Sequence, residues 1–256
     1  MALQVVTVPC LKDNFAFLAH DPVSGATAVV DVPDAAPVLA ALEAQGWRAS
    51  DVLLTHHHGD HVQGLEELQA GLEAAQGTRA RVIGAAADAH RLPVLDVTLG
   101  PDDPVTLGGV SGKVLDVSGH TVGHVAYVFD GVAFTGDSLM ALGCGRLFEG
   151  DAAMMWASLS RLMALPGGTR ICSGHDYLDG NLAFAQSVEP GNAEAAERVA
   201  RARREGPEAV HVTLAQERAT NPFLRAGEAA VKAAVGMPQG TAEEVFAELR
   251  RRKDSF

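Results

Sequence analysis

The sequence predicts an α/β layered sandwich followed by a helical C-terminal subdomain. Up to about residue 175, short β-branched runs alternate with Gly, Pro and Asp turns, a pattern typical of strands. Between these runs lie segments with apolar residues at three- and four-residue spacing, which indicates amphipathic helices. After about residue 178 the composition shifts to Ala, Glu and Arg. We therefore expect one domain over residues 1–177 and a helical subdomain over residues 178–256.

The expected elements follow in chain order. The strands are Gln4–Val8, Phe15–His20, Ala26–Asp31, Asp51–Leu54, Arg81–Gly84, Val105–Leu107, Lys113–Val117, Val125–Asp130, Val132–Thr135 and Arg170–Ser173. Asp130 and Gly131 predict a hairpin turn between two of them. The helices are Ala35–Gln45, Gly64–Ala75, Ala152–Ala164, Gly180–Val188, Asn192–Arg204, Gly227–Val235 and Thr241–Arg252. Thr241 and Glu244 form a capping box that begins the last helix.

The composition excludes several classes of protein. Of 256 residues, 47% are hydrophobic and 20% are charged, as in ordinary globular proteins. The net charge of -12 disfavours binding to nucleic acid or to anionic membranes, which needs clustered Lys and Arg. There is neither a signal-peptide pattern nor a run of about 20 apolar residues. The three cysteines, Cys10, Cys144 and Cys172, have no disulfide or zinc spacing. We expect a cytoplasmic monomer without a nucleic-acid or membrane partner.

A dense group of potential metal ligands follows the strand that ends near Leu54. Because successive side chains of an extended segment alternate in direction, His56 and His58 converge on one ion while His57 faces away. Asp60 and His61 stand at the turn into the next helix, where they reach a second ion. Imidazole and carboxylate ligands suit Zn, Fe or Mn better than Ca or Mg. The embedded Asp and the apolar strand argue against a surface histidine cluster.

Three further candidate ligands each follow an apolar strand: His120 in Ser-Gly-His-Thr, Asp137 in Thr-Gly-Asp, and His175 in Ser-Gly-His. A lone His or Asp at a strand end is more often structural than a ligand. Three of them beside the histidine-rich loop favour ligands for two ions.

In this order the motifs resemble the signature of the metallo-β-lactamase superfamily, which implies an αββα sandwich. The resemblance implies that His56, His58 and His120 bind one metal, that Asp60, His61 and His175 bind the other, and that Asp137 bridges both. Asp31 resembles a buried acid of the family, although a purely structural acid fits it equally well. The resemblance implies two bound divalent ions, zinc first and Fe or Mn as alternatives, which would activate a bridging hydroxide as the nucleophile. Asp60 is a candidate for orienting that water.

Three other segments resemble glyoxalase II within this superfamily. Gly143–Gly150 is similar to the family's Gly-Cys-Gly-Lys-Phe-Tyr-Glu-Gly loop, which places Arg146 as a glutathione contact beside Phe148. Gly174–Tyr177 matches Gly-His-Glu-Tyr and places Tyr177 near the metals. The C-terminal residues resemble Arg-Arg-x-Lys-Asp-x-Phe, so that Arg250 and Lys253 form a cation pair for a glutathione carboxylate. A solvated basic helix end is the alternative for this pair. Leu147, Phe148 and Asp176 depart from the family's Phe, Tyr and Glu.

The resemblance implies hydrolysis of S-(2-hydroxyacyl)glutathione thioesters, chiefly S-D-lactoylglutathione to D-lactate and glutathione. The alternatives are another enzyme of the fold, such as a β-lactamase, a lactonase, another thioesterase or a persulfide dioxygenase, and a metal-binding protein without catalysis. A nuclease is disfavoured by the negative charge. His124, four residues after His120, is expected to contact a metal ligand. Cys144 is disfavoured as a nucleophile.

Overall fold

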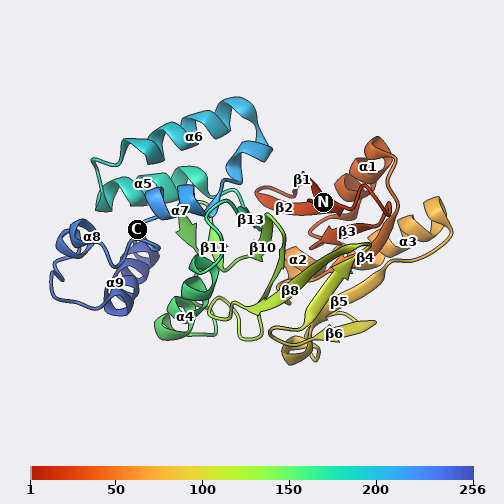
Figure 1. Cartoon of the computed structure of the whole chain (residues 1–256), viewed down its shortest axis with the longest axis horizontal. Helices are drawn as coiled ribbons and strands as arrows, with labels where there is room; N and C mark the ends of the chain where they lie inside the picture. Colours follow the sequence, from red (N-terminus) through yellow and green to blue (C-terminus); the bar gives the residue numbers. More distant parts are fainter. Residues whose placement is uncertain (1) are drawn as a thin grey trace. The chain divides into compact units, whose positions relative to one another are not determined.

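The computed structural model describes residues 2–256, and Figure 1 shows the course of the chain. The chain divides into two compact units. The N-terminal unit runs to Asp116 and also contains Gly123–Gly136, whereas the C-terminal unit contains Val117–Val122 and Asp137–Phe256. This division by contacts differs from the boundary at residue 178 that the composition suggests. That functional boundary stays a prediction.

A mixed six-stranded sheet forms the first layer of the N-terminal unit. Its strands lie in chain order: β1 (Gln4–Cys10), β2 (Asn14–His20), β3 (Thr27–Val30), β4 (Ala49–Leu53), β5 (Arg81–Ala85) and β6 (Val97–Leu99). The pairs β1–β2 and β2–β3 are antiparallel, and the pairs from β3 to β6 are parallel. Helices α1 (Ala35–Gln45) and α3 (Leu65–Gln76) make the crossovers that parallel pairing requires. The parallel strands therefore end at one edge, where the ligand-rich loop begins.

A second, antiparallel sheet packs on the first. Its strands in this unit lie in the order β10 (Val132–Gly136), β9 (Val125–Phe129), β8 (Val110–Asp116) and β7 (Pro104–Leu107). The Asp130-Gly131 hairpin is confirmed, because Val132 pairs with Phe129. Between the sheets, the Tyr127 hydroxyl donates to the carbonyl of Leu54 at 2.9 Å, and the rings of Phe17 and Phe134 lie 5.5 Å apart. These contacts confirm the layered sandwich.

The helices of the N-terminal unit cover the other face of the first sheet. α1 and α3 contact each other and bury Val38, Leu42, Leu68 and Leu72 in a cluster with strand residues such as Leu18. Asp34 begins α1 by accepting a hydrogen bond from the Ala36 amide, as expected for an N-cap residue. The apolar stripes that predicted these two helices are thus the surfaces that hold them against the sheet.

The C-terminal unit is mostly helical. Its elements are β11 (Leu139–Met140), β12 (Gly143–Cys144), α4 (Ala152–Met163), β13 (Arg170–Ser173), α5 (Leu178–Val188), α6 (Ala193–Glu205), α7 (Leu214–Thr220), α8 (Ala229–Ala234) and α9 (Ala242–Asp254). α5 and α6 lie side by side, and α4 packs against α9 (Figure 1). The buried rings of Phe184, Phe223 and Phe246 form the core of the unit, with neighbouring centroids 5.6 and 5.9 Å apart.

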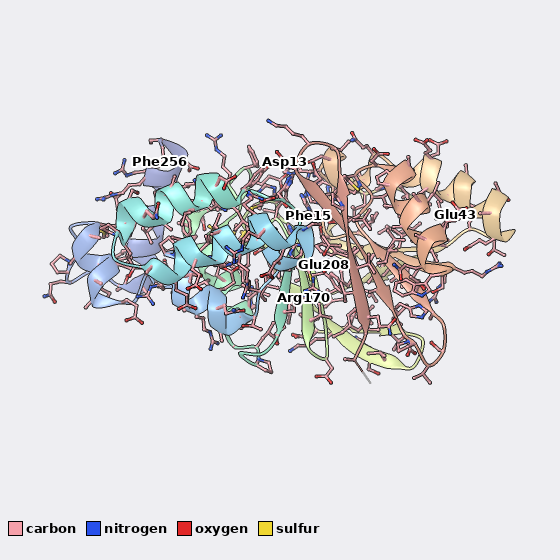
Figure 2. The ribbon with its side chains drawn as sticks, turned by 90° about the horizontal axis from the view of Figure 1, so that it is seen from above. Asp13, Phe15, Glu43, Arg170, Glu208 and Phe256 are labelled. Carbon is pink, nitrogen blue, oxygen red and sulfur yellow. The ribbon has the colours of Figure 1, made fainter. Side chains whose placement is uncertain are left out.

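The stretch between β13 and α7 is held by polar contacts. Arg170 forms an ion pair with Glu208 of the short 3₁₀ helix η2 (Pro207–Val210), and Figure 2 shows the two residues near one another. The Ile171 amide donates to the carbonyl of Val212 at 2.9 Å. Thr213 then begins α7 with a capping box that includes Gln216. After α5 and α6, the chain thus returns along β13 before it enters α7.

The expected strands and helices are found, with bounds that shift by a few residues. The structure adds elements that the patterns did not predict: β6, the β11–β12 hairpin, α7, α2 (Gly59–Val62), η2 and η1 (Ala86–Asp88). Each spans seven residues or fewer, too short for a helical or strand period to stand out. Among residues 2–256, no helix has the length and apolar character needed to cross a bilayer.

Candidate metal centre

The carboxylate of Asp31 organises the histidine-rich loop after β4. Asp31 is buried, has φ of 56°, and accepts hydrogen bonds from the amide and hydroxyl of Thr55, each at 2.8 Å. It also accepts from Nδ1 of His61 at 2.9 Å. Nδ1 of His56 lies 3.0 Å from the Thr55 hydroxyl, whose proton goes to Asp31. Both imidazoles therefore keep Nε2 available for a metal.

Further hydrogen bonds, to Asp88 and from Asn14, hold this loop. His57 faces away from the ligand group, as expected, and its Nδ1 donates to buried Asp88 at 2.9 Å. Arg91 donates to the other oxygen of Asp88 at 2.5 Å. The side-chain amide of Asn14 donates to the carbonyl and the carboxylate of Asp60, both at 3.0 Å. Sequence reasoning missed Asn14 and Asp88, because neither belongs to a motif and only the fold brings them to the loop.

His124 was expected to contact a metal ligand, and its ring stacks on His56 with centroids 4.5 Å apart. Gly136, with φ of 47°, makes room for this arrangement: a Cβ there would lie 2.6 Å from the Thr55 hydroxyl and 2.9 Å from Nε2 of His124. The Gly before Asp137 is thus a steric requirement of the site.

The remaining candidate ligands belong to the C-terminal unit. Nε2 of His120 and Nε2 of His175 lie 3.5 and 3.3 Å from one carboxylate oxygen of Asp137. Nδ1 of His120 donates to the carbonyl of Arg146 at 2.8 Å, which leaves Nε2 as the ligand atom. All three side chains are buried.

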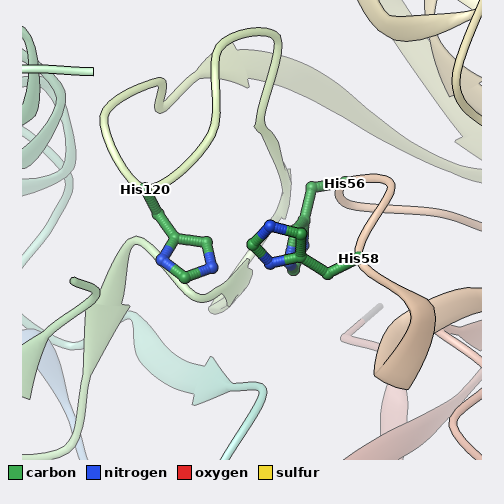
Figure 3. Close-up of side chains that lie close together, drawn as sticks. All are labelled: His56, His58 and His120. Atoms are coloured by element: carbon green, nitrogen blue, oxygen red, sulfur yellow. The ribbon is translucent and has the colours of Figure 1, made fainter. Parts of the chain in front are cut away.

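The structure brings the seven predicted ligands together in three groups, in each of which the ligand atoms lie within 4.8 Å of one another. The groups are His56, His58 and His120; His56, His61 and Asp137; and Asp60, His61 and His175. Figure 3 shows the first group with its three imidazoles turned toward one another. The first and third groups are the two expected ligand sets. In the second group Asp137 lies with His56 of one expected set and His61 of the other, and its bridging role stays a prediction.

The donor set fits borderline divalent metals. Five imidazoles and two carboxylates without a thiolate suit Zn, Fe or Mn, and Ca or Mg would favour a shell of oxygens. Buried histidines whose Nδ1 is held by a protein acceptor, as in His61 and His120, are typical of a transition-metal site.

We expect Asp31→Asn to weaken metal binding by about 10- to 100-fold, because Asp31 orients His61 directly and His56 through Thr55. Asn tolerates the positive φ of this position. Metal retention against a chromophoric chelator measures the effect. Asp21→Asn is the control, since Asp21 is equally buried and accepts from Ser24 and Gly109. Equal metal retention in both variants would contradict the role of Asp31.

Three predicted substrate contacts lie beside the ligand histidines. The Tyr177 ring stacks on His175 with centroids 4.7 Å apart, and the Phe148 ring lies 5.2 Å from that of His120. The Arg146 guanidinium lies 5.9 Å from the Phe148 centroid. All three side chains are substantially exposed, at 42% for Tyr177, 62% for Phe148 and 61% for the Arg146 side chain. They are accessible next to the candidate metal centre.

The predicted cation pair on α9 is unequal. Arg250 is buried and donates to the carbonyl of Cys144 and to Asp254, both at 2.9 Å. Lys253 is partly exposed, and its ammonium donates to the carbonyl of Gly180 in the first turn of α5 at 2.7 Å. Burial, together with the charge of Arg250, lowers the pKa of Lys253. Arg250 therefore has protein partners, and Lys253 presents the more accessible charge.

Cys10, Cys144 and Cys172 are all unbridged and buried, in agreement with their lack of a disulfide spacing. Burial raises the pKa of Cys144 to about 11, despite the opposing charge of Arg250. A thiol with so high a pKa is a poor nucleophile at neutral pH, which agrees with the exclusion of Cys144.

Comparison with known proteins identifies relatives over the whole chain. The model of the metallo-beta-lactamase superfamily matches residues 21–175, and that of the hydroxyacylglutathione hydrolase C-terminus matches residues 176–256. A hydroxyacylglutathione hydrolase of Fuscovulum blasticum is 62% identical over 100% of both chains. Another from Methylococcus capsulatus is 51% identical over 99% of both.

Solved structures share the fold. ETHE1 from Myxococcus xanthus superposes with a TM-score of 0.66 at 21% identity, covering 98% of this chain and 90% of that one. The protein TTHA1623, solved in a di-iron-bound form, gives a TM-score of 0.58 at 26% identity, covering 86% of this chain and 100% of that one.

Proposed function

The chain belongs to the hydroxyacylglutathione hydrolases of the metallo-β-lactamase superfamily, and we propose that it hydrolyses S-(2-hydroxyacyl)glutathione thioesters, chiefly S-D-lactoylglutathione to D-lactate and glutathione. The observation that carries this proposal is the contact between Tyr177 and His175. It places a residue of the segment matched by the hydroxyacylglutathione hydrolase model directly against a candidate metal ligand.

The proposed centre holds two divalent ions. His56, His58 and His120 would hold one ion, Asp60, His61 and His175 the other, and Asp137 would bridge them. When bound, such ions lower the pKa of water to about 7 and stabilise negative charge that develops on a carbonyl oxygen. We propose zinc as the native metal, and Fe and Mn remain compatible with the donors.

The protein supplies orientation and proton handling. The Asp60 carboxylate is held by Asn14 and is 44% exposed, so it is placed to orient a water molecule and accept its proton. In the net reaction the water oxygen bonds to the thioester carbon, the carbon–sulfur bond breaks, and the departing sulfur takes a proton. The products are a hydroxy acid and glutathione thiol. The phenol of Tyr177 is exposed and can donate a hydrogen bond to the acyl group.

The proposed glutathione site lies in the C-terminal unit. Arg146, Arg250 and Lys253 are local cations in a chain of net charge -12, and anionic peptide carboxylates are their natural ligands. Arg146 and Arg250 both approach one oxygen of Asp254, at 3.7 and 2.9 Å. We assign catalysis to residues 1–177 and glutathione binding to residues 178–256 and the loop that carries Arg146 and Phe148. A monomer in the cytoplasm stays the expectation for the cell.

The deciding experiment follows thioester absorbance when purified, metal-loaded protein is mixed with S-D-lactoylglutathione, with the metal content of the same sample measured. Turnover at about two ions per chain is the expected result. Full metal content without turnover, together with efficient hydrolysis of a lactone or of a thioester lacking glutathione, would overturn the substrate assignment. Oxygen consumption with glutathione persulfide would point instead to a dioxygenase.

We expect Lys253→Ala to raise KM for the glutathione thioester about fivefold and to leave kcat unchanged, because a partly exposed ion pair contributes up to about 1 kcal/mol. Burial, together with the charge of Arg250, lowers the pKa of Lys253, so its charge is lost as pH rises through a value below that of an ordinary lysine. Wild-type KM should therefore rise at alkaline pH.

Lys253→Arg should flatten this alkaline rise in KM, because a guanidinium stays protonated. Lys113→Ala is the charge-matched control, since Lys113 is exposed on β8 in the N-terminal unit. Steady-state kinetics between pH 7 and about pH 10 measure the KM of the wild type and of each variant. An unchanged KM in Lys253→Ala would exclude Lys253 from the glutathione site.

A further inference from the structure

The β11–β12 hairpin lies directly after Asp137 and has an unusual turn. Leu139 pairs with Cys144 and Met140 with Gly143, so the turn consists of Ala141 and Leu142. Leu142 has φ of 57°, a left-handed conformation that is costly for a branched apolar residue. The turn therefore needs support from outside the hairpin.

Polar side chains of the C-terminal helices bind the backbone of this turn. The buried Glu217 carboxylate of α7 accepts from the Leu142 amide at 3.1 Å. The Asn221 amide donates to the carbonyl of Gly143 at 2.9 Å, and the Asn181 amide donates to that of Ala141 at 2.9 Å. Backbone groups of the hairpin that face the helices thus find side-chain partners.

Glu217 is held in place by a buried ion pair. Arg198 of α6 donates to one oxygen of Glu217 and, at 3.0 Å, to the hydroxyl of Thr220. The side chains of Arg198 and Glu217 are 3% and 1% exposed. The second oxygen of Glu217 accepts from Leu142 and, at 3.2 Å, from Asn221. This set of Arg198, Glu217 and Asn221 is called the hairpin anchor below.

The hairpin connects the anchor to two candidate metal ligands. At its start stands Asp137, and at its end the Gly145 amide donates to the carbonyl of Ser138 at 3.0 Å. Gly145 packs so closely that a Cβ there would lie 1.9 Å from the Asp137 carbonyl. The next residue, Arg146, supplies the carbonyl that accepts from Nδ1 of His120. A shift of the hairpin would therefore displace Asp137 and release the ring of His120.

We propose that Glu217, held by Arg198, is a positioning residue of the metal centre: its acceptance of the Leu142 amide sets the hairpin that places Asp137 and orients His120. The inference rests on the proposed metal-binding role of these two ligands. Neither Glu217 nor Arg198 is among the candidate ligands. Their effect on the metal passes through the hydrogen bond that Glu217 accepts from the Leu142 amide and then through the hairpin.

A buried ion pair is not needed for stability as such. Replacing one by well-packed apolar residues is often neutral or stabilising, whereas removing an acceptor from a buried backbone N–H leaves that group unsatisfied. The contribution of the Arg198–Glu217 pair to stability can therefore be separated from its role in positioning the hairpin. A neutral pair that keeps the acceptor should preserve the site, and an apolar pair that fills the space should not.

The test compares two double variants. Arg198→Gln with Glu217→Gln keeps an amide oxygen for the Leu142 N–H, and Arg198→Met with Glu217→Leu removes it. Hydrogen exchange of residues 138–146 in the metal-stripped protein, and metal retention against a chelator, are measured at a temperature where both variants are folded by circular dichroism.

The apolar pair should lose exchange protection at the hairpin and retain metal at least about tenfold more weakly, with kcat falling alongside. The amide pair should stay within about threefold of wild type. Arg225→Met with Glu189→Leu is the matched control, because this pair lies in the same unit, is partly buried, and has no hydrogen bond to the hairpin.

Wild-type protection and metal retention in the apolar pair would overturn the proposal, as would an equal loss in both anchor variants or in the control. Because exchange and metal retention need no substrate, they decide this question even if the wild-type protein fails to hydrolyse glutathione thioesters. Failure of the proposed function is thereby distinguished from failure of the inference.

Discussion

Asp137→Ala should lose metal from the whole centre and reduce kcat by about a thousandfold or more, equivalent to about 4 kcal/mol of transition-state stabilisation. The expected loss follows from the candidate metal ligands that surround Asp137. Asp137 shares a group with His56 and His61, which belong to different ligand sets, and its carboxylate oxygen lies 3.3 Å from Nε2 of His175. Removing this carboxylate takes a ligand from both sets and leaves buried imidazoles without their negative partner.

Metal analysis and thioester kinetics on the same preparation check this expectation. Asp151→Ala is the control, since Asp151 caps α4 by accepting from the Met154 amide, and its loss should cost only about 1 kcal/mol of stability without affecting the metal. Asp137→Ala with two ions per chain and near wild-type kcat would show that Asp137 is not a shared ligand.

The directions of His56 and His58 could be predicted from the sequence because of strand geometry, whereas the full ligand sets came from the resemblance to the superfamily. His56 and His58 follow a strand whose parallel neighbours end at the same edge of the sheet. Alternation along the backbone is a local property, so the spacing of the two residues was sufficient. The outward direction of His57 was predicted on the same ground, and Asp88 accounts for it in the structure.

The residues that hold these ligands could not be predicted in this way. Asn14 binds Asp60 across 46 positions, and Glu217 binds Leu142 across 75, so no local period relates either pair. Glu217 lies in a seven-residue helix that carries no clear apolar stripe, and its neighbour Asn221 reads from sequence as a turn residue. Their roles arise from the fold, through buried backbone groups that need partners.

The candidate substrate contacts could be predicted from the sequence only in part. Arg250 and Lys253 were paired because they are three positions apart on one helix, and α9 does carry both. Spacing could not reveal that Arg250 turns inward to the Cys144 carbonyl, or that Asp254 lies between Arg250 and Arg146. The carboxylate of Asp254 occupies the position between two cations that a substrate carboxylate would seek. Lys253 is the more exposed member of the pair on α9, and its contact with glutathione stays a prediction.

Complete removal of metal by a chelator should abolish thioester hydrolysis and lower the melting temperature. Four of the five imidazoles and the Asp137 carboxylate are buried, and ions that bind only the folded chain offset the cost of burying them together. The stabilisation amounts to about 4 kcal/mol for each ion at a thousandfold excess over its Kd. Thermal unfolding and kinetics on the stripped protein measure the two losses independently.

Reconstitution with Zn, Fe(II) or Mn then separates the role of the site from the choice of metal. We expect all three to restore the melting temperature, because the histidine and carboxylate donors suit each of them. Turnover should return in proportion to the ions bound, reaching its maximum at about two per chain. Full turnover in protein shown by elemental analysis to contain no metal would contradict the centre. Recovery complete at one ion would reduce it to a mononuclear site, in which Asp60, His61 and His175 would only support the other ligands.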